Sequence, residues 1–276
     1  MCQVLKIFDA KIYLYNICVM LGFLIGYFVF LIRSRKVFKP EIQDSIIAMI
    51  GADIPFIIAG AILHNKFAYA NSINVFFDIM PVNTGIAFLG GFIGGLMGFL
   101  LLFPVFVGKQ VPMIEVMNEL APSIIVGHAV GRVGCLLAGC CYGKPSEWGI
   151  IYEAGTPAYN TYGAVKLFPV PIVEIIFLFV LFFIVLAKRE KAASIYLTGY
   201  AVIRFFLEFL RGDVRGGRGL LSPAQKICVS IFAVMAGINC AIWYKRHHLK
   251  FLALYFQNKK IFKNKGQKNT VKIKKG

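Results

Sequence analysis

The fold is decided by long apolar stretches, and the clearest of them, residues 170–187, reads VPIVEIIFLFVLFFIVLA. It holds a single charged residue, Glu174. A helix needs about 20 apolar residues to cross the hydrocarbon core of a bilayer. Six more stretches qualify or nearly do: 13–32, 45–63, 82–107, 118–138, 194–210 and 224–244. The sequence therefore predicts an all-α fold class, a polytopic membrane helical bundle with about seven transmembrane helices.

The composition of the whole chain supports this prediction. Of 276 residues, 58% are hydrophobic and 16% are charged, and the mean hydropathy is +0.72. Soluble domains are nearer half apolar and a quarter charged. The same figures exclude a disordered chain, a collagen-like chain and a small disulfide-rich secreted protein. We predict one transmembrane domain over 1–244, followed by a basic cytoplasmic tail over 245–276.

The distribution of basic residues predicts how the helices are oriented. The net charge is +17, and the tail has eleven basic residues and no acidic one. The loops at 33–39 and 188–191 are also basic, and such loops stay in the cytoplasm. We therefore place the N-terminus outside and the C-terminus in the cytoplasm. The tail is expected to contact anionic lipid at the bilayer surface, and we expect no nucleic-acid partner.

The loop after residue 210 breaks the charge pattern, because Arg211, Arg215 and Arg218 would lie outside. Either these residues bind an anionic ligand, or they contact lipid phosphates at the surface. Arg204, Glu208 and Arg211 are spaced i, i+4, i+7, which places all three on one helical face. A glutamate between two arginines leaves a net positive charge that suits a phosphate. The alternative is an internal ion pair that holds helices together.

A second polar cluster lies in 127–135, which reads GHAVGRVGC. His128 and Arg132 are spaced i, i+4, and small residues around them permit close approach of another helix or a ligand. Arg132 is expected at the outer end of its helix, where it can converge with Arg211 on one group. His128 is expected to be an interior histidine with satisfied hydrogen bonds. Glu174, soon after Pro171, is expected to cap the N-terminus of its helix.

Glycines and cysteines leave alternatives open. The stretch 82–107 carries Gly85, Gly90, Gly91, Gly94, Gly95 and Gly98. These form either a packing seam between helices or a seam that admits a lipid headgroup. Cys135, Cys140 and Cys141 have no standard zinc spacing, so we predict no metal site, with a reactive thiol or an external disulfide as the alternatives.

Several separate motifs resemble those of the bacterial prolipoprotein diacylglyceryl transferases. The run at 131–143, GRVGCLLAGCCYG, is similar to the family pattern G-R-x-G-N-F-x-N-G-E-x-x-G. Arg204, Glu208 and Arg211 match R-F-x-x-E-x-x-R, and the family's L-S-x-x-Q ends at Gln225. The run 90–94 resembles the family's H-G-G-x-x-G, and Tyr15 stands where the family carries a tyrosine. The resemblance extends over nearly the whole chain.

The resemblance implies an enzyme of the bacterial plasma (inner) membrane that spans it several times. Such enzymes move a diacylglyceryl group from phosphatidylglycerol to the thiol of a lipobox cysteine in a prolipoprotein, and glycerol phosphate leaves. It implies neither a cofactor nor a metal. The implied catalytic residues are Arg132, Arg204, Glu208 and Tyr15. The implied substrate-binding residues are Gly90, Gly91, Gly94, His128, Gly131, Gly134, Cys135, Gly139, Gly143, Arg211 and Gln225.

The sequence departs from the family pattern at polar positions. The family histidine is Leu89, its asparagine is Cys135 and its glutamate is Cys140. The family's H-P-x-Q reads FPVP at 168–171, and Asp53 replaces a residue that is often basic. The alternative is a non-catalytic or substrate-altered membrane protein of this fold that binds anionic phospholipid. A transporter or channel with an arginine-lined path is less favoured, because the sequence shows no repeated halves.

Overall fold

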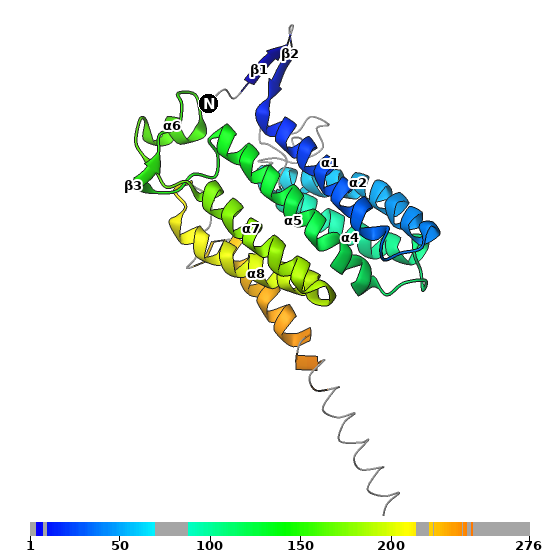
Figure 1. Cartoon of the computed structure of the whole chain (residues 1–276). Helices are drawn as coiled ribbons and strands as arrows, with labels where there is room; N and C mark the ends of the chain where they lie inside the picture. The colour runs from blue at the N-terminus through cyan, green and yellow to red at the C-terminus, as the bar shows by residue number, and fades with distance from the viewer. Residues whose placement is uncertain are drawn as a thin grey trace, which may run out of the picture. The chain divides into compact units, whose positions relative to one another are not determined.

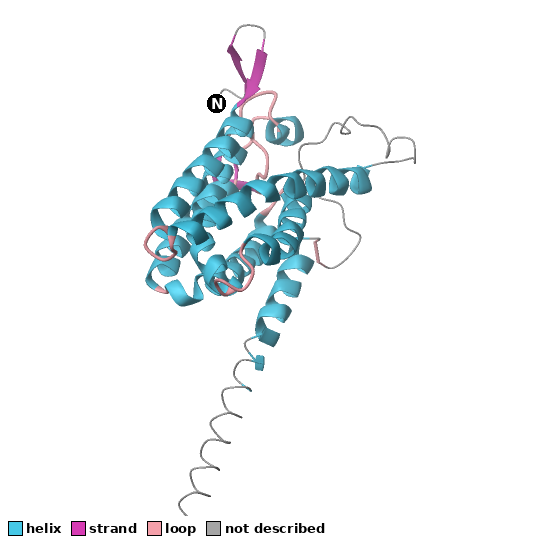
Figure 2. Cartoon of the chain, turned by 90° about the vertical axis from the view of Figure 1, so that its right-hand side faces the viewer, coloured by secondary structure: helices cyan, strands magenta, loops and turns pink. Residues whose placement is uncertain are grey.

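The computed structural model describes residues 4–7, 10–69, 88–213, 221–222, 224–238, 240–241 and 244. Helix is the prevailing element in these ranges (Figure 2). The chain divides into two compact units. The first comprises Met1–Tyr196 with Leu210–Asp213, and the second comprises Leu197–Phe209 with Val214–Gly276.

The first unit begins with a hairpin that the sequence analysis did not predict. Strands β1 (Val4–Ile7) and β2 (Ala10–Tyr13) pair antiparallel and lead directly into α1 (Leu14–Ser34) (Figure 1). The register places Leu5 opposite Ile12 and Ile7 opposite Ala10. Strands this short give too brief a period-two pattern to be recognised beside a long apolar helix.

The helices of the first unit follow the predicted apolar stretches. They are α2 (Pro40–Tyr69), α4 (Phe88–Phe106), α5 (Met113–Ala138), α7 (Val170–Ala187) and the start of α8 (Ala192–Leu207). Between α5 and α7 lie strand β3 (Pro145–Ile150) and the short helix α6 (Pro157–Tyr162), and η1 (Arg189–Lys191) precedes α8.

Among the described residues, five helical segments are long and apolar enough to cross a membrane: Leu14–Ser34, Pro40–Leu63, Met113–Ala138, Val170–Ala187 and Arg189–Leu210. The other two predicted stretches contain shorter apolar helices, Gly90–Phe106 and Ala224–Ile238. The prediction of a helical membrane protein is confirmed. The count of seven crossings and the orientation of the termini stay predictions, and the tail 245–276 lies outside the residues described.

Helices α1 and α5 run antiparallel with their backbones in close contact. A Cβ atom on Gly22 would lie 2.8 Å from the carbonyl oxygen of Gly127, and one on Gly26 would lie 2.9 Å from that of Ser123. Without a hydrophobic driving force between lipid-embedded helices, such close approach supplies much of the packing energy. The start of α1 therefore lies beside the end of α5.

The glycines of α4 form a similar seam with α2. A Cβ atom on Gly60 would lie 2.8 Å from the Cα of Gly94, and one on Gly91 would lie 3.5 Å from the Ile57 side chain. Gly90 contacts Gly60 through its carbonyl oxygen. These contacts give the glycines the packing role that the sequence left as one alternative. A substrate-binding role for Gly90, Gly91 and Gly94 stays a prediction, and Gly85 lies outside the described ranges.

A buried carboxylate joins the end of α1 to the start of α5. Glu119, near the start of α5, pairs with Arg33 at the end of α1 (Nη2–Oε2 3.4 Å) and with Arg189 of η1. Asn118 donates to the carbonyl oxygen of Glu190 (2.8 Å) and accepts from the backbone N–H of Ala193 (2.9 Å). Polar contacts thus fix the turn between α7 and α8 against α5.

In the second unit, Ser222 and Gln225 form a capping box at the start of the helix Ala224–Ile238. The Ser222 N–H donates to Gln225 Oε1 (3.0 Å), and the Gln225 N–H donates to Ser222 Oγ (3.2 Å). This reciprocal pair satisfies backbone donors that a helix start leaves unpaired. The S-x-x-Q motif therefore has a local structural role, and substrate binding by Gln225 stays a prediction.

Candidate functional site

The first buried ion pair of the site joins α5 to α7. Arg132 Nη2 lies 3.0 Å from Glu174 Oε1, and the two side chains are 13% and 1% exposed. The predicted capping role of Glu174 is wrong. Pro169 is the N-cap of α7, and Glu174 is the fifth residue of the helix, beyond the four N–H groups that a cap can satisfy. The Glu174 carboxylate instead forms an ion pair with the Arg132 guanidinium.

His128 extends this pair into a chain of polar groups. Its Nδ1 lies 3.3 Å from the Tyr196 hydroxyl, and its Nε2 lies 3.9 Å from Glu174 Oε1. The histidine side chain is buried, which agrees with the expectation of an interior, hydrogen-bonded residue. Sequence reasoning missed Tyr196 and the partnership with Glu174. The sequence did hold a signal for this partnership, because Glu174 is a lone charge in an apolar stretch. A charge near mid-bilayer costs about 2.5–3.5 kcal/mol, so a partner for it is expected.

Three cysteines meet where α5 ends. The sulfur atoms of Cys135, Cys140 and Cys141 all lie within 4.8 Å of one another. Gly139 follows the helix in the left-handed conformation (φ +63°), and the Cys140 N–H donates to the Cys135 carbonyl oxygen (3.2 Å). This reversal of the chain returns Cys140 and Cys141 to the last turn of the helix. The linear spacing of the cysteines did not reveal the cluster.

Two arginines flank the cysteine cluster. Arg132 Nη1 lies 3.9 Å from Cys135 Sγ, and the Arg211 guanidinium interacts with the Cys141 thiol. Hydrogen bonds with Cys135 and Cys140, assisted by the charges of Arg211 and Arg132, hold the pKa of Cys141 well below its ordinary value. Hydrogen bonding to Cys135 raises the pKa of Cys140. The cluster therefore favours one thiolate, at Cys141.

The predicted helical face of Arg204, Glu208 and Arg211 is wrong at Arg211. Helix α8 ends at Leu207, and the 3₁₀ turn η2 (Glu208–Leu210) alters the angular spacing of the residues beyond it. Arg211 forms two hydrogen bonds to Asp213, at 2.8 and 2.7 Å. The Arg211 guanidinium is thus paired with a carboxylate two residues further along the chain.

The loop that carries the cysteines is fixed on both sides. The Gly143 N–H donates to the Phe168 carbonyl oxygen, and the Lys144 N–H donates to that of Leu210, both at 2.9 Å. A Cβ atom on Gly143 would lie 2.6 Å from the Phe168 oxygen, and one on Gly139 would lie 2.5 Å from Thr156 Cβ. These two glycines of the motif are therefore required by the loop's close contacts.

The other two glycines of the motif differ in their surroundings. A Cβ atom on Gly134 would lie 2.9 Å from Cys18 Cβ and 3.3 Å from Tyr15 Cδ2, which places Tyr15 beside the site. A Cβ atom on Gly131 would find no atom of the described residues within 4 Å. The α5 surface at Gly131, one residue before Arg132, is thus not covered by the described residues.

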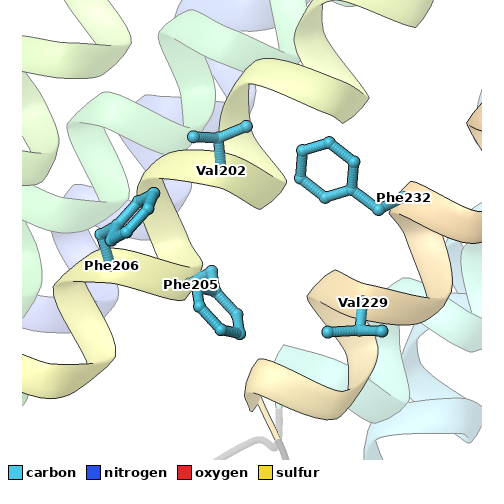
Figure 3. A pocket seen from close by; sticks show the side chains of 5 residues that line it. All are labelled: Val202, Phe205, Phe206, Val229 and Phe232. Atoms are coloured by element: carbon cyan, nitrogen blue, oxygen red, sulfur yellow. The ribbon is translucent and has the colours of Figure 1, made fainter.

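The second unit holds another buried pair and an apolar hollow. Arg204 Nη2 lies 2.6 Å from Glu208 Oε2, with side chains 8% and 7% exposed. Val202, Phe205 and Phe206 of α8 line the hollow with Val229 and Phe232 of the helix Ala224–Ile238 (Figure 3). The hollow is lined by apolar side chains, and α8 also carries Arg204. The Leu89 side chain, Arg215 and Arg218 fall outside what the structure describes.

Comparison with known proteins identifies the family. A family model for prolipoprotein diacylglyceryl transferase matches residues 3–243. The phosphatidylglycerol–prolipoprotein diacylglyceryl transferase 2 of Clostridium perfringens is 34% identical over 248 residues, which cover 84% of this chain and 91% of that protein. The transferase of Clostridium tetani is 32% identical over 241 residues, which cover 84% of this chain and 93% of that protein. The chain belongs to the prolipoprotein diacylglyceryl transferase family.

Proposed function

We propose that this chain transfers the diacylglyceryl group of phosphatidylglycerol to the thiol of a lipobox cysteine in a prolipoprotein. The thiol sulfur bonds to the glyceryl carbon, the carbon–oxygen bond to phosphate breaks, and glycerol phosphate leaves. The observation that carries the proposal is the buried Arg132–Glu174 pair within a family match over residues 3–243. The names of the two clostridial relatives give the same two substrates.

Arg132 is suited to the charge that develops on the leaving group. As the phosphate diester becomes a monoester, negative charge grows on its oxygens, and a fixed cation in a site of low dielectric stabilises that change. A guanidinium carries five N–H donors, enough to hold Glu174 on one edge and a phosphate on another. Glu174 keeps the guanidinium in place, and the open surface at Gly131 gives the lipid access.

Arg204 is proposed to bind the phospholipid, with Glu208 orienting its guanidinium. The acyl chains then lie along the phenylalanine-lined hollow of the same unit. Tyr15 and His128 are proposed to position polar groups of the substrates. This assignment keeps the residues that the family resemblance implied and adds Glu174 to them.

We further propose seven crossings of the bacterial plasma membrane, with the N-terminus outside, a domain over 1–244 and a cytoplasmic tail over 245–276. Arg33 and Arg189 meet at Glu119, whereas Tyr15 and Arg132 lie toward the other end of α1 and α5. Glu119 and Arg132 are separated by about 20 Å of helix, at 1.5 Å per residue. With the basic end in the cytoplasm, the Arg132 end lies in the outer half of the membrane.

The test is a reconstituted transfer reaction. Purified protein is mixed with labelled phosphatidylglycerol and a lipobox peptide, and the peptide mass is followed. The proposal predicts a gain of one diacylglyceryl group, lost in Arg132→Gln and kept in the matched control Arg33→Gln. If folded protein binds the lipid but transfers nothing, it is a phospholipid-binding protein or uses another acceptor.

A further inference from the structure

The geometry of Cys135, Cys140 and Cys141 suits a single metal ion. Their sulfur atoms lie within 4.8 Å of one another, and the centre of a triangle with such edges is about 2.8 Å from each corner. Zinc–sulfur bonds are about 2.3 Å long. Each sulfur therefore needs to move inward by at most about half an ångström to bind an ion at that centre.

The backbone holds the three cysteines in position independently of any ion. Cys135 is in the last turn of α5, and Gly139 and Gly143 fix the loop that returns Cys140 and Cys141 to it. Cys141 itself has a positive φ of 61°, which is uncommon for a residue other than glycine. The cluster is thus held by the fold, as a preformed binding site requires.

The charges around the cluster suit a metal–thiolate centre. Three thiolates and a divalent cation carry one net negative charge. Arg132 lies 3.9 Å from the Cys135 sulfur, and Arg211 interacts with Cys141, so positive charge is present beside two of the three thiols. Thiolate ligands select soft or borderline cations such as Zn²⁺ over Mg²⁺ or Ca²⁺.

We propose that Cys135, Cys140 and Cys141 bind one zinc-like cation whose fourth position is taken by the thiol of the lipobox cysteine. This inference rests on the proposed transferase function. Catalytic zinc sites commonly have three protein ligands and one position open to substrate, and a thiol that coordinates zinc is deprotonated. The cation thereby deprotonates the thiol without a side-chain base.

The reaction step balances without a redox partner. Coordination releases the thiol proton to solvent, and the sulfur electron pair forms the bond to the glyceryl carbon. The electrons of the broken carbon–oxygen bond remain on the phosphate oxygen, beside Arg132. A thiol of pKa about 8.5 is about 3% ionised at pH 7, so full ionisation raises the thiolate concentration about 30-fold.

The first experiment measures metal binding without catalysis. Full-length protein, purified in detergent under reducing conditions and freed of metal, is titrated with Co²⁺ as a spectroscopic substitute for Zn²⁺. We expect one Co²⁺ per chain, with a thiolate charge-transfer band whose intensity corresponds to three sulfurs, and displacement by Zn²⁺. Cys140→Ser and Cys141→Ser lose the band, whereas the exposed-site control Cys240→Ser keeps it. Wild-type protein without the band overturns the inference, even if the variants fail to fold.

The second experiment separates this inference from the proposed function. A lipobox peptide is expected to raise the charge-transfer intensity toward four sulfurs, and a peptide with serine for cysteine is not. Metal-free protein is expected to transfer diacylglycerol about 30-fold more slowly, with recovery on adding Zn²⁺. Unchanged transfer without metal overturns the metal inference and leaves the transferase. Intact three-sulfur binding with no transfer under any condition contradicts the transferase and the fourth-position assignment together.

Discussion

The Arg132–Glu174 pair gives the sharpest test of the site. In Arg132→Gln, the Glu174 side chain, only 1% exposed, loses the guanidinium that lies 3.0 Å from its carboxylate. Removing one partner of a buried ion pair costs about 3–5 kcal/mol of folding free energy, because the other charge remains buried. Glu174→Gln is expected to cost a similar amount. Either loss changes the unfolding equilibrium more than about 100-fold.

The double variant Arg132→Gln/Glu174→Gln is expected to behave differently. It buries two neutral amides that can hydrogen-bond to each other, so its stability is expected to return to within about 1–2 kcal/mol of wild type. It cannot present a cation to the leaving phosphate, and loss of such a group lowers kcat by about 10²–10³-fold. Stability is measured by SDS titration in mixed micelles, followed by circular dichroism, and turnover by peptide mass.

Two results would contradict this prediction. A double variant that folds and turns over like wild type would show that the pair serves only to hold α5 against α7. Single variants as stable as wild type would show that Glu174 is not confined in a site of low dielectric. The matched control Arg33→Gln removes an arginine from the Glu119 pair at the other end of α5 and should leave kcat unchanged.

Four further substitutions test the surroundings of the site. Glu119→Gln is expected to lower unfolding free energy by about 1 kcal/mol in SDS titration, with unchanged kcat, because its partner Arg33 is partly exposed. Gly131→Leu should leave stability intact and raise the KM for phosphatidylglycerol, whereas Gly134→Leu should reduce folded yield, because only Gly134 has atoms close to the added side chain. Gly139→Ala should lower the melting temperature by the equivalent of at least about 1–2 kcal/mol, the cost of the left-handed conformation, because the added Cβ would also lie 2.5 Å from Thr156 Cβ; equal thermal stability would contradict both observations.

The helices could be predicted because their signal is local. A long apolar run by itself predicts a helix that is buried in lipid. The stretch 170–187 accordingly forms α7 with the predicted bounds. The family motifs also lie within short runs, so the resemblance could be recognised from the sequence. The family match over residues 3–243 confirmed it. The partner of a buried charge carries no such signal. Arg132 and Glu174 are far apart in sequence, and hydrophobic periodicity does not state which helix faces which.

The failures at Arg211 and at the cysteines have a common cause. Both arise where a helix ends and regular spacing no longer predicts direction. Beyond Leu207 the 3₁₀ turn redirects Arg211 to Asp213, and beyond Ala138 the left-handed Gly139 turns Cys140 and Cys141 back toward Cys135. A glycine just after a helix is a recognisable stop signal, so the second reversal was accessible from the sequence. Its consequence for the sulfur atoms required coordinates.

The departures from the family pattern acquire a different meaning in three dimensions. Considered one position at a time, Cys135 and Cys140 are losses of an asparagine and a glutamate. In the structure these two residues and Cys141 form one cluster, between the two arginines Arg132 and Arg211. Loss of activity alone gives no reason for three thiols to gather beside Arg132, where we propose that the thiol substrate meets the leaving phosphate. A change of ligand chemistry does give such a reason. Under our proposal, sulfur ligands replace the polar groups together, and they act on the thiol substrate through the metal that they bind. Arg132, which we propose to bind the phosphate, is unaffected by that replacement, and it still matches the family pattern.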